Sequence, residues 1–352
     1  MFYGSLKSFE SKFDALARKE AFQGKTAKEL LAWQKSAQTK LCSLLGLELM
    51  ERISPIPVVL DHTRLENGIT REKVLIRTED EVFMPFYILI PDSAGPDTRI
   101  FICPAGHQGA GKESVAGNGE QPLVKQMISF YNYDYALKLA KAGFVAVAPD
   151  PRGFSERRDE AKQAEEDILS STCFHLAHMA EPLGYTVPGL LVWDLMRLVD
   201  YLVERGNWSV EDIAVLGFSG GGMQSLYLAA LEPRIQMAFI SGYFYGFKDS
   251  LLVLNGNCSC NYVPSLWRSF DMGDIASLFA PRPLVIQSCS EDHLNGSRGM
   301  KNVQEQYAIV QKNYELLGAS KKLYHDIVSG EHHFSDTHML LALETVLGEV
   351  HA

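Results

Sequence analysis

The sequence predicts an α/β fold in which a mainly parallel central sheet is covered by helices on both faces. Two observations support this prediction. Short apolar runs recur along the chain, and most of the later runs are separated by stretches whose apolar residues recur every three or four positions. Because short runs are typical of buried strands and the longer period is typical of helices, the chain alternates strand with helix, as a parallel sheet requires.

Each element follows from its own stretch of sequence. The runs that predict strands are 73–76, 84–90, 100–103, 144–148, 213–216, 237–241, 284–288 and 323–328. The stretches that predict helices are 135–142, 190–203, 223–231, 303–317 and 337–347. Only the polar turn Thr-Glu-Asp-Glu at 78–81 joins the first two strands, so the sheet is expected to begin with an antiparallel hairpin.

Residues 1–52 precede this alternation and are expected to form a helical N-terminal extension that packs on the main body. Apolar residues recur there at helical spacing, from Leu30 to Leu45. Residues 53–352 then form one α/β domain, because a single core with insertions can absorb this length. The carboxyl ends of parallel strands are where ligand sites form. Loop insertions that follow predicted strand ends are expected near 105–130, 154–188 and 246–272.

Composition argues against several partners. The net charge of −10 disfavours nucleic acid, because phosphate binding needs a basic surface. The chain has no run of about 18 apolar residues, so no membrane span is expected. Its N-terminus lacks the basic start and apolar stretch of a secretion signal, so we expect a cytoplasmic location.

The six cysteines are expected to be small buried hydrophobic residues in a reducing compartment. Cys258 and Cys260 lie close together in the sequence and could instead bind a metal. No second Cys/His pair stands at zinc-finger spacing, so neither a metal nor another cofactor is predicted. The cysteines are Cys42, Cys103, Cys173, Cys258, Cys260 and Cys289.

The strongest functional signal is Leu-Gly-Phe-Ser-Gly-Gly-Gly at 216–222. It places Ser219 between glycines, where a predicted strand gives way to a predicted helix. So sharp a turn strains the serine backbone and brings chain segments close together, which requires small residues such as Gly217 and Gly221 two positions away. Ser219 is therefore predicted to be a nucleophile rather than a surface serine in a glycine-rich turn.

A serine nucleophile needs a base beside it and a carboxylate that orients the base. The strand predicted at 284–288 is followed by two carboxylates, Glu291 and Asp292. Both would lie at the same edge of the sheet as Ser219, because they follow the carboxyl end of a strand. Asp292 is preferred, since its short side chain suits a loop turn, and Glu291 is the alternative.

The base is expected after the strand at 323–328, in the sequence Gly-Glu-His-His-Phe at 330–334. His332 is preferred to His333 by its spacing from Gly330 and Phe334. This loop also follows the carboxyl end of a strand, so it reaches the edge where Ser219 is expected.

Charge that develops on a reacting carbonyl oxygen must meet fixed hydrogen-bond donors. One predicted donor is the backbone N–H of Gly220, the residue after the nucleophile. The second is expected from Ala-Gly-His-Gln-Gly at 105–109, which follows the strand at 100–103. His107 would donate there through its backbone, with Gln108 as the alternative.

Taken in order over residues 55–350, these motifs resemble the dienelactone-hydrolase-like and acetyl-xylan-esterase-like branch of the α/β-hydrolases. The resemblance implies the α/β-hydrolase fold and ester hydrolysis through an acyl-enzyme, without a cofactor. It also favours Asp292 as the acid. Ala105 departs from the pattern, because many relatives have histidine there. The motifs are those at 105–109, 148–154, 192–202, 217–221, 280–284 with Asp292, and 330–334.

We therefore expect a serine carboxylesterase that cleaves a small acyl group, acetyl among the candidates, from a small-molecule ester. A peptidase or amide hydrolase would use the same residues, and a ligand-binding homologue without turnover would keep the fold. Arg152 is expected to pair with a carboxylate beneath the site. A homo-oligomer is also considered, with the N-terminal helices as an interface. The candidate substrate contacts are Gln108, Tyr243, Phe244 and Trp267.

Overall fold

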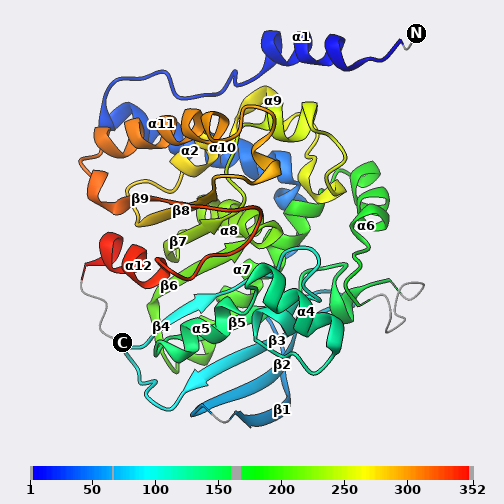
Figure 1. The fold of residues 1–352 in the computed structure, drawn as a ribbon, viewed down its shortest axis with the longest axis vertical. Coiled ribbons are helices and arrows are strands. Elements are labelled where there is room, and N and C mark those ends of the chain that lie inside the picture. The colour runs from blue at the N-terminus through cyan, green and yellow to red at the C-terminus, as the bar shows by residue number, and fades with distance from the viewer. Residues whose placement is uncertain (1–2, 66, 160–167, 349–352) are drawn as a thin grey trace.

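In the computed structural model, residues 3–65, 67–159 and 168–348 are described, and residues 160–167 of the predicted insertion at 154–188 lie outside that part. Within it, one nine-stranded sheet has the order β1-β2-β3-β5-β4-β6-β7-β8-β9 (Figure 1). The strands are β1 (Pro57–Leu65), β2 (Ile69–Glu79), β3 (Val82–Pro91), β4 (Arg99–Ile102), β5 (Val145–Pro149), β6 (Ser209–Phe218), β7 (Ile235–Ser241), β8 (Leu284–Cys289) and β9 (Leu323–Val328).

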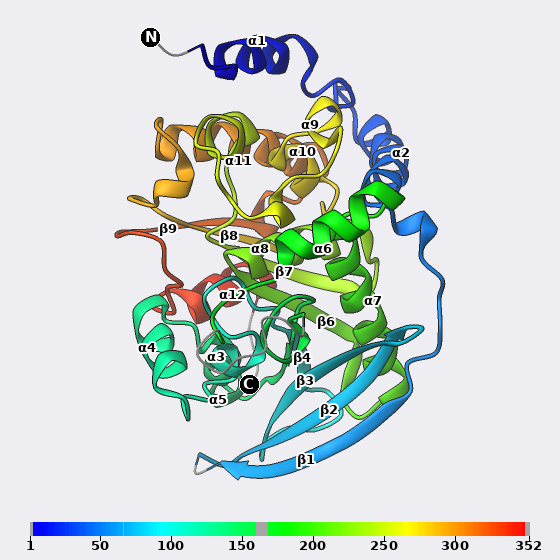
Figure 2. The same ribbon diagram turned by 90° about the vertical axis from the view of Figure 1, so that its right-hand side faces the viewer.

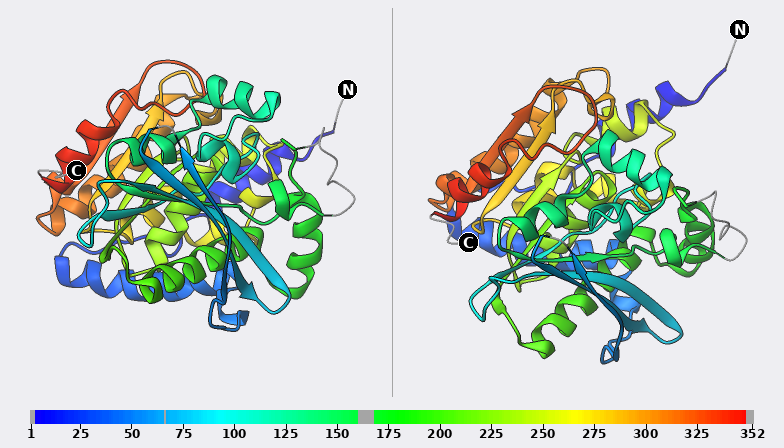
Figure 3. Two further views of the ribbon diagram at one scale, coloured as in Figure 1. Left: turned by 90° about the horizontal axis from the view of Figure 1, so that it is seen from below. Right: turned by 60° about the horizontal axis from the view of Figure 1, so that its bottom comes forward.

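The pairing of the strands confirms the predicted mainly parallel sheet with an antiparallel start. Strands β1, β2, β3 and β5 pair antiparallel in that order. All pairs from β5 and β4 through β9 are parallel. Figure 3 shows the blue and cyan strands, β1 to β3, crossing in front of the later strands. The parallel strands therefore share one carboxyl edge, where their following loops meet.

Strand β1 was not predicted from the sequence. It forms the edge of the sheet and is exposed along most of its length, with Val58, Val59 and Leu60 about half exposed. Its side chains do not alternate between buried and exposed, and its short apolar run, Val58 to Leu60, was not among the runs from which strands were predicted. Its backbone pairing with β2 defines it instead.

Helices cover both faces of the sheet, as predicted. In β6, Ile213 and Val215 pack into one apolar cluster, whereas Ala214 and Leu216 pack into the other. This alternation arises because successive side chains of a strand point to opposite faces. Figure 2 shows α7 and α12 on opposite sides of the sheet. On one face lie α2 (Ala27–Leu45), α7 (Val187–Arg205), α8 (Gly220–Leu231), α10 (Met272–Ser277) and α11 (Met300–Leu316), and on the other α5 (Tyr135–Lys141) and α12 (Met339–Leu347).

The other helices lie around these layers and in the connections. Of the helices placed in the described ranges, none is long and apolar enough to span a membrane. The remaining α-helices are α1 (Leu6–Leu16), α3 (Lys112–Val115), α4 (Pro122–Tyr131), α6 (Cys173–Ala180) and α9 (Leu266–Ser269).

Helix α2 ties the N-terminal segment to the main body. It begins with a capping box, in which Thr26 and Glu29 each accept a backbone N–H of the other, and ends at Gly46 in the left-handed conformation. Its Leu41 and Leu45 lie in the same apolar cluster as α7 and α8. The first helix, α1, extends from the top of the molecule in Figure 1. Thus α2 packs into the core of the α/β domain, although it precedes the alternation of strands and helices in the sequence.

A buried ion-pair network holds the loop after β5. Arg152 donates two hydrogen bonds to Asp194 of α7, at 2.8 and 2.7 Å, and Arg157 donates a third at 2.7 Å. Burial opposes ionisation of Asp194, but the two guanidinium groups outweigh it and hold the pKa of that carboxyl well below its usual range. The carboxylate expected to pair with Arg152 is therefore on α7.

Replacing Asp194 by alanine is expected to lower the free energy of unfolding by about 3–5 kcal/mol, because the buried Arg157 loses the carboxylate it pairs with and Arg152 keeps only Glu79 among its described partners. Urea unfolding measures the change. The matched control is Asp92→Ala, whose partner Arg64 and own side chain are both exposed, and which should change stability far less. Equal effects in the two variants would contradict the prediction.

The same network predicts an acid dependence. A carboxyl whose pKa is depressed on folding stabilises the protein above the pKa of the unfolded chain, about 4 for aspartate, and that contribution is lost as the pH falls towards the folded value. The stability difference between the wild type and Asp194→Ala should therefore narrow below about pH 4.

Candidate active site

Ser219 stands at the sharp turn between β6 and α8. Its backbone has φ 56° and ψ −122°, a strained conformation for a residue with a side chain. The turn is held by a 2.9 Å hydrogen bond from the Ser219 N–H to the carbonyl of Ser241 in β7. The strain lifts the Ser219 hydroxyl out of the strand and over the carboxyl edge of the sheet.

The glycines around Ser219 are required by close contacts of the backbone. A Cβ on Gly217 would lie 2.2 Å from the carbonyl oxygen of Gly221. A Cβ on Gly221 would lie 2.1 Å from the carbonyl oxygen of Pro104, just after β4. Since both obstacles are backbone atoms, they cannot swing away as a flexible side chain would.

The variant Gly221→Ala is expected to destabilise the protein by about 1–3 kcal/mol, because the loop after β4 and the start of α8 must separate. Urea unfolding measures this, and any ester hydrolysis should fall with it. Gly95→Ala is the control, since a Cβ there has no atom within 4 Å. If Gly221→Ala were as stable as the wild type, the contact between Gly221 and the Pro104 carbonyl would not be tight.

His332 and Asp292 meet at Ser219. The His332 Nε2 atom lies 2.9 Å from the Ser219 Oγ, and the His332 Nδ1 atom lies 2.6 Å from the Asp292 Oδ2. The other Asp292 oxygen accepts the N–H of Leu294 at 2.8 Å, which fixes the carboxylate. The loops that follow β6, β8 and β9 supply the three side chains, all at the carboxyl edge of the sheet.

The structure distinguishes between the alternatives at both positions. Asp292 is buried, whereas Glu291 is exposed and is not bonded to the His332 ring. His333 turns away, with its Nδ1 2.8 Å from the Glu331 carbonyl and 3.6 Å from the Cys289 sulfur. Of the two candidate acids and two candidate bases, Asp292 and His332 are thus the pair brought to Ser219.

The loop after β4 packs directly against the start of α8. A Cβ on Gly106 would lie 2.9 Å from the Gly220 nitrogen, and one on Gly220 would lie 3.1 Å from the His107 ring. Tyr133 donates to the His107 carbonyl at 2.7 Å, and Tyr135 donates to the Pro104 carbonyl at 2.6 Å. Two buried phenols therefore fix the carbonyls of this loop.

Beside Ser219, two backbone donors have no hydrogen-bond partner among the described residues. Gly220 is the first residue of α8, so the helix offers no acceptor for its N–H. No acceptor among the described residues takes the N–H of His107. These two groups are the donors that the sequence predicted for a carbonyl oxygen at this site.

A cavity of about 370 Å³ opens at Ser219 and His332. Of the candidate substrate contacts, Gln108 and Tyr243 line it. Phe244 does not, because it is buried in the core, and Trp267 does not, because it packs against Phe13 of α1 and Phe247. The other lining residues are His107, Tyr131, Tyr133, Phe218, Gly220, Tyr245, Gly256, Asn257, Cys258, Asn261, His293 and Leu294.

The cavity is lined largely by polar and aromatic side chains. None of the described residues that line it is lysine, arginine, aspartate or glutamate. The buried Tyr243 hydroxyl has no hydrogen-bond partner among the described residues. Burial raises the pKa of Tyr243 and Tyr245 well above the ordinary value, so both phenols stay neutral. Sequence analysis missed Tyr245, Asn257 and Asn261, whose residue types alone do not distinguish wall from core.

A mainly parallel sheet with a strained serine turn, and with histidine and aspartate on later loops of the same edge, defines the α/β-hydrolase class. The sequence resemblance to this class is thereby confirmed at the level of the fold. The chain belongs to the Abhydrolase family, which it matches over residues 9–327.

Other proteins resemble this chain over most of its length. "Putative hydrolase YtaP" of Bacillus subtilis (strain 168) is 24% identical over 286 residues, which cover 79% of this chain and 88% of that protein. The crystal structure of a putative acetyl xylan esterase from Bacteroides fragilis superposes with a TM-score of 0.75 and 21% identity, covering 94% of this chain and 83% of the other. A glucuronoyl esterase from Solibacter usitatus gives 0.66 and 16%, covering 95% and 97%. These structural likenesses show a shared fold.

Proposed function

We propose that this protein is a serine carboxylesterase that hydrolyses small neutral esters through an acyl-enzyme. The observation that carries the proposal is the position of His332, whose two ring nitrogens lie within hydrogen-bond distance of Ser219 and Asp292. A base so oriented can accept a proton from the serine and later return it.

In the proposed reaction, the Ser219 hydroxyl oxygen attacks the ester carbonyl while His332 Nε2 takes its proton. Asp292 holds the proton on Nδ1 and stabilises the imidazolium that forms. The alcohol leaves with the proton from Nε2, and the acyl group remains on Ser219. A water molecule then repeats the sequence, with His332 again as base, and releases the acid.

The backbone N–H groups of Gly220 and His107 are proposed to bind the oxyanion. Their support is rigid, because Gly106 is pressed against Gly220 and the His107 carbonyl is held by Tyr133. Fixed donors need no reorganisation as charge develops, which makes each of them worth about 3 kcal/mol in well-studied hydrolases.

The cavity favours a small acyl group and a neutral, polar alcohol. Its volume of about 370 Å³ suits a small molecule, and its described lining residues include no lysine, arginine, aspartate or glutamate that would pair with an ionic substrate. The unpaired Tyr243 hydroxyl and the amides of Asn257 and Asn261 offer hydrogen bonds to hydroxyl groups. The names of the structural neighbours suggest acetylated sugars and uronic acid esters as compounds to assay.

The proposal is tested by assaying purified protein on acetyl, butyryl and octanoyl esters of p-nitrophenol, on acetylated sugars and on matching amides. We expect turnover of esters, highest for acetyl. A fluorophosphonate should label native protein at Ser219 and leave heat-denatured protein unlabelled. Cleavage of amides without esters would favour a peptidase, and absence of labelling would favour a ligand-binding protein; either result would overturn the proposal.

A further inference from the structure

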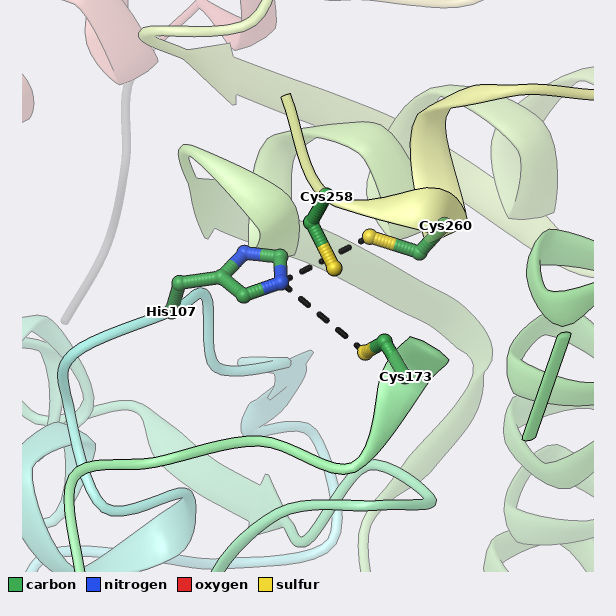
Figure 4. A group of neighbouring side chains, drawn as sticks. All are labelled: His107, Cys173, Cys258 and Cys260. Carbon is green, nitrogen blue, oxygen red and sulfur yellow. Dashed lines mark hydrogen bonds between the residues drawn. The ribbon is translucent and has the colours of Figure 1, made fainter. Parts of the chain in front are cut away.

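Three cysteines and a histidine converge beside the cavity. The ligand-type atoms of His107, Cys173, Cys258 and Cys260 all lie within 4.8 Å of one another (Figure 4). The His107 Nε2 is 3.6 Å from the Cys260 sulfur and 3.9 Å from the Cys173 sulfur. None of the three sulfurs is in a disulfide. The expectation that the cysteines are only small buried hydrophobic residues does not account for this grouping.

The spacing agrees with the geometry of a tetrahedral zinc ion. Zinc binds thiolate sulfur at about 2.3 Å and imidazole nitrogen at about 2.0 Å, so the sulfur–nitrogen edge of the tetrahedron is about 3.5 Å. The two measured edges, 3.6 and 3.9 Å, require shifts of a few tenths of an ångström or less. Ordinary packing of thiols gives no reason for three of them to face one ring nitrogen.

The surroundings of the cluster also suit a metal. Cys173 and Cys260 are fully buried, while His107 and Cys258 are partly exposed towards the cavity. The Asn261 amide donates to the Cys260 sulfur at 3.7 Å. Such outer hydrogen bonds orient metal ligands and stabilise a thiolate.

We propose that His107, Cys173, Cys258 and Cys260 bind one zinc ion, with all four coordination positions filled by the protein. Three thiolates and an imidazole favour zinc over hard cations such as magnesium or calcium, which prefer oxygen ligands. A closed set of four protein ligands is typical of a structural zinc site.

The ligands come from the three insertions that surround the active site. His107 follows β4, Cys173 begins α6, and Cys258 and Cys260 flank the start of a short 3₁₀-helix, Ser259–Asn261. One ion would therefore join three segments that are far apart in the sequence. Because His107 also offers its backbone N–H at Ser219, zinc on its ring would fix the peptide that the proposed reaction uses. His107 is in this sense a positioning residue through its side chain.

Metal analysis tests the site directly and does not depend on esterase activity. Protein purified with reductant and dialysed against a weak chelator at neutral pH should retain about one zinc per chain, because four-ligand sites bind zinc tightly. Cys173→Ser, Cys258→Ser and Cys260→Ser should each reduce the retained zinc at least about tenfold. Cys42→Ser is the matched control, since Cys42 lies on α2 outside the cluster, and it should retain zinc fully.

A second measurement needs no variant and so does not depend on their folding. Cys258 is partly exposed, so it should be alkylated quickly if it is a free thiol and slowly if it is bound to zinc. Stripping the zinc with a strong chelator should expose it, and re-adding zinc should protect it again. Cobalt in place of zinc should give the intense thiolate-to-metal absorption of a tetrahedral site.

Three outcomes would overturn the proposal. They are wild-type protein that neither holds nor takes up zinc, rapid alkylation of Cys258 whether or not zinc is present, and a disulfide among the three cysteines in protein purified without oxidant. If the cysteine variants lose zinc but keep the esterase turnover of the wild type, the zinc site is established and only its proposed effect on His107 is refuted.

Discussion

Replacing Ser219 by alanine is expected to lower kcat for an ester substrate by about 10⁶-fold, the scale seen when the nucleophile of a comparable serine hydrolase is removed. Alanine keeps the Cβ of serine, so the strained backbone at φ 56° is unchanged and only the attacking oxygen is lost. The residual rate would come from the two backbone donors and the cavity. Steady-state assays with p-nitrophenyl acetate, with a burst titration for contaminating active enzyme, give the measurement.

The control for this variant is Ser36→Ala, because Ser36 is an exposed serine of α2 whose hydroxyl bonds only the Trp33 carbonyl among the described residues. Its kcat should equal that of the wild type. Unfolding curves should show that Ser219→Ala is folded. Undiminished turnover by a folded Ser219→Ala protein would refute the assignment of the nucleophile.

Replacing Asp292 by asparagine should lower kcat by about 10⁴-fold, because the histidine loses its orienting carboxylate. The Asp292 carboxylate accepts a hydrogen bond from the N–H at Nδ1 of His332, 2.6 Å away, which keeps the ring proton on Nδ1 and leaves Nε2 free to accept the serine proton. An asparagine NH₂ group would donate to Nδ1 instead. The ring proton would then move to Nε2, which could no longer act as the base.

The sharpest control is the neighbouring carboxylate. Glu291→Gln removes the same charge one residue away, from an exposed side chain that is not bonded to His332, and should leave kcat nearly unchanged. A large loss in Glu291→Gln with little loss in Asp292→Asn would reverse the assignment of the acid. Comparable small losses in both would show that His332 needs no carboxylate partner.

Local sequence was sufficient to predict structure wherever the conformation of a segment depends on that segment's own residues. Ser219 could be identified because the glycines that its turn requires are its near neighbours, and the structure shows that Gly217 and Gly221 have no room for a side chain. Asp292 and His332 could be placed near it because parallel strands bring all their carboxyl ends to one edge. The topology of a parallel sheet therefore supports this prediction without any interatomic distance.

Local sequence failed where a residue's role depends on what packs against it. Phe244 and Tyr245 are adjacent aromatic residues after β7, yet the first is core and the second lines the cavity. Trp267 was a candidate for the cavity wall and instead packs under α1. Aromatic side chains serve both purposes, so their direction is decided by the neighbouring loops and not by their own residue type.

Sequence by itself thus determined the strand and helix alternation, the sharp turn at Ser219 and the loops that carry Asp292 and His332, because each depends on local spacing and on one topological rule. Tertiary structure alone decided which of Glu291 and Asp292 faces His332, and it alone joined His107 to Cys173 and Cys260, which are 66 and 153 residues away. Contacts over such separations follow from how the loops pack around the sheet, and no spacing along the chain records them.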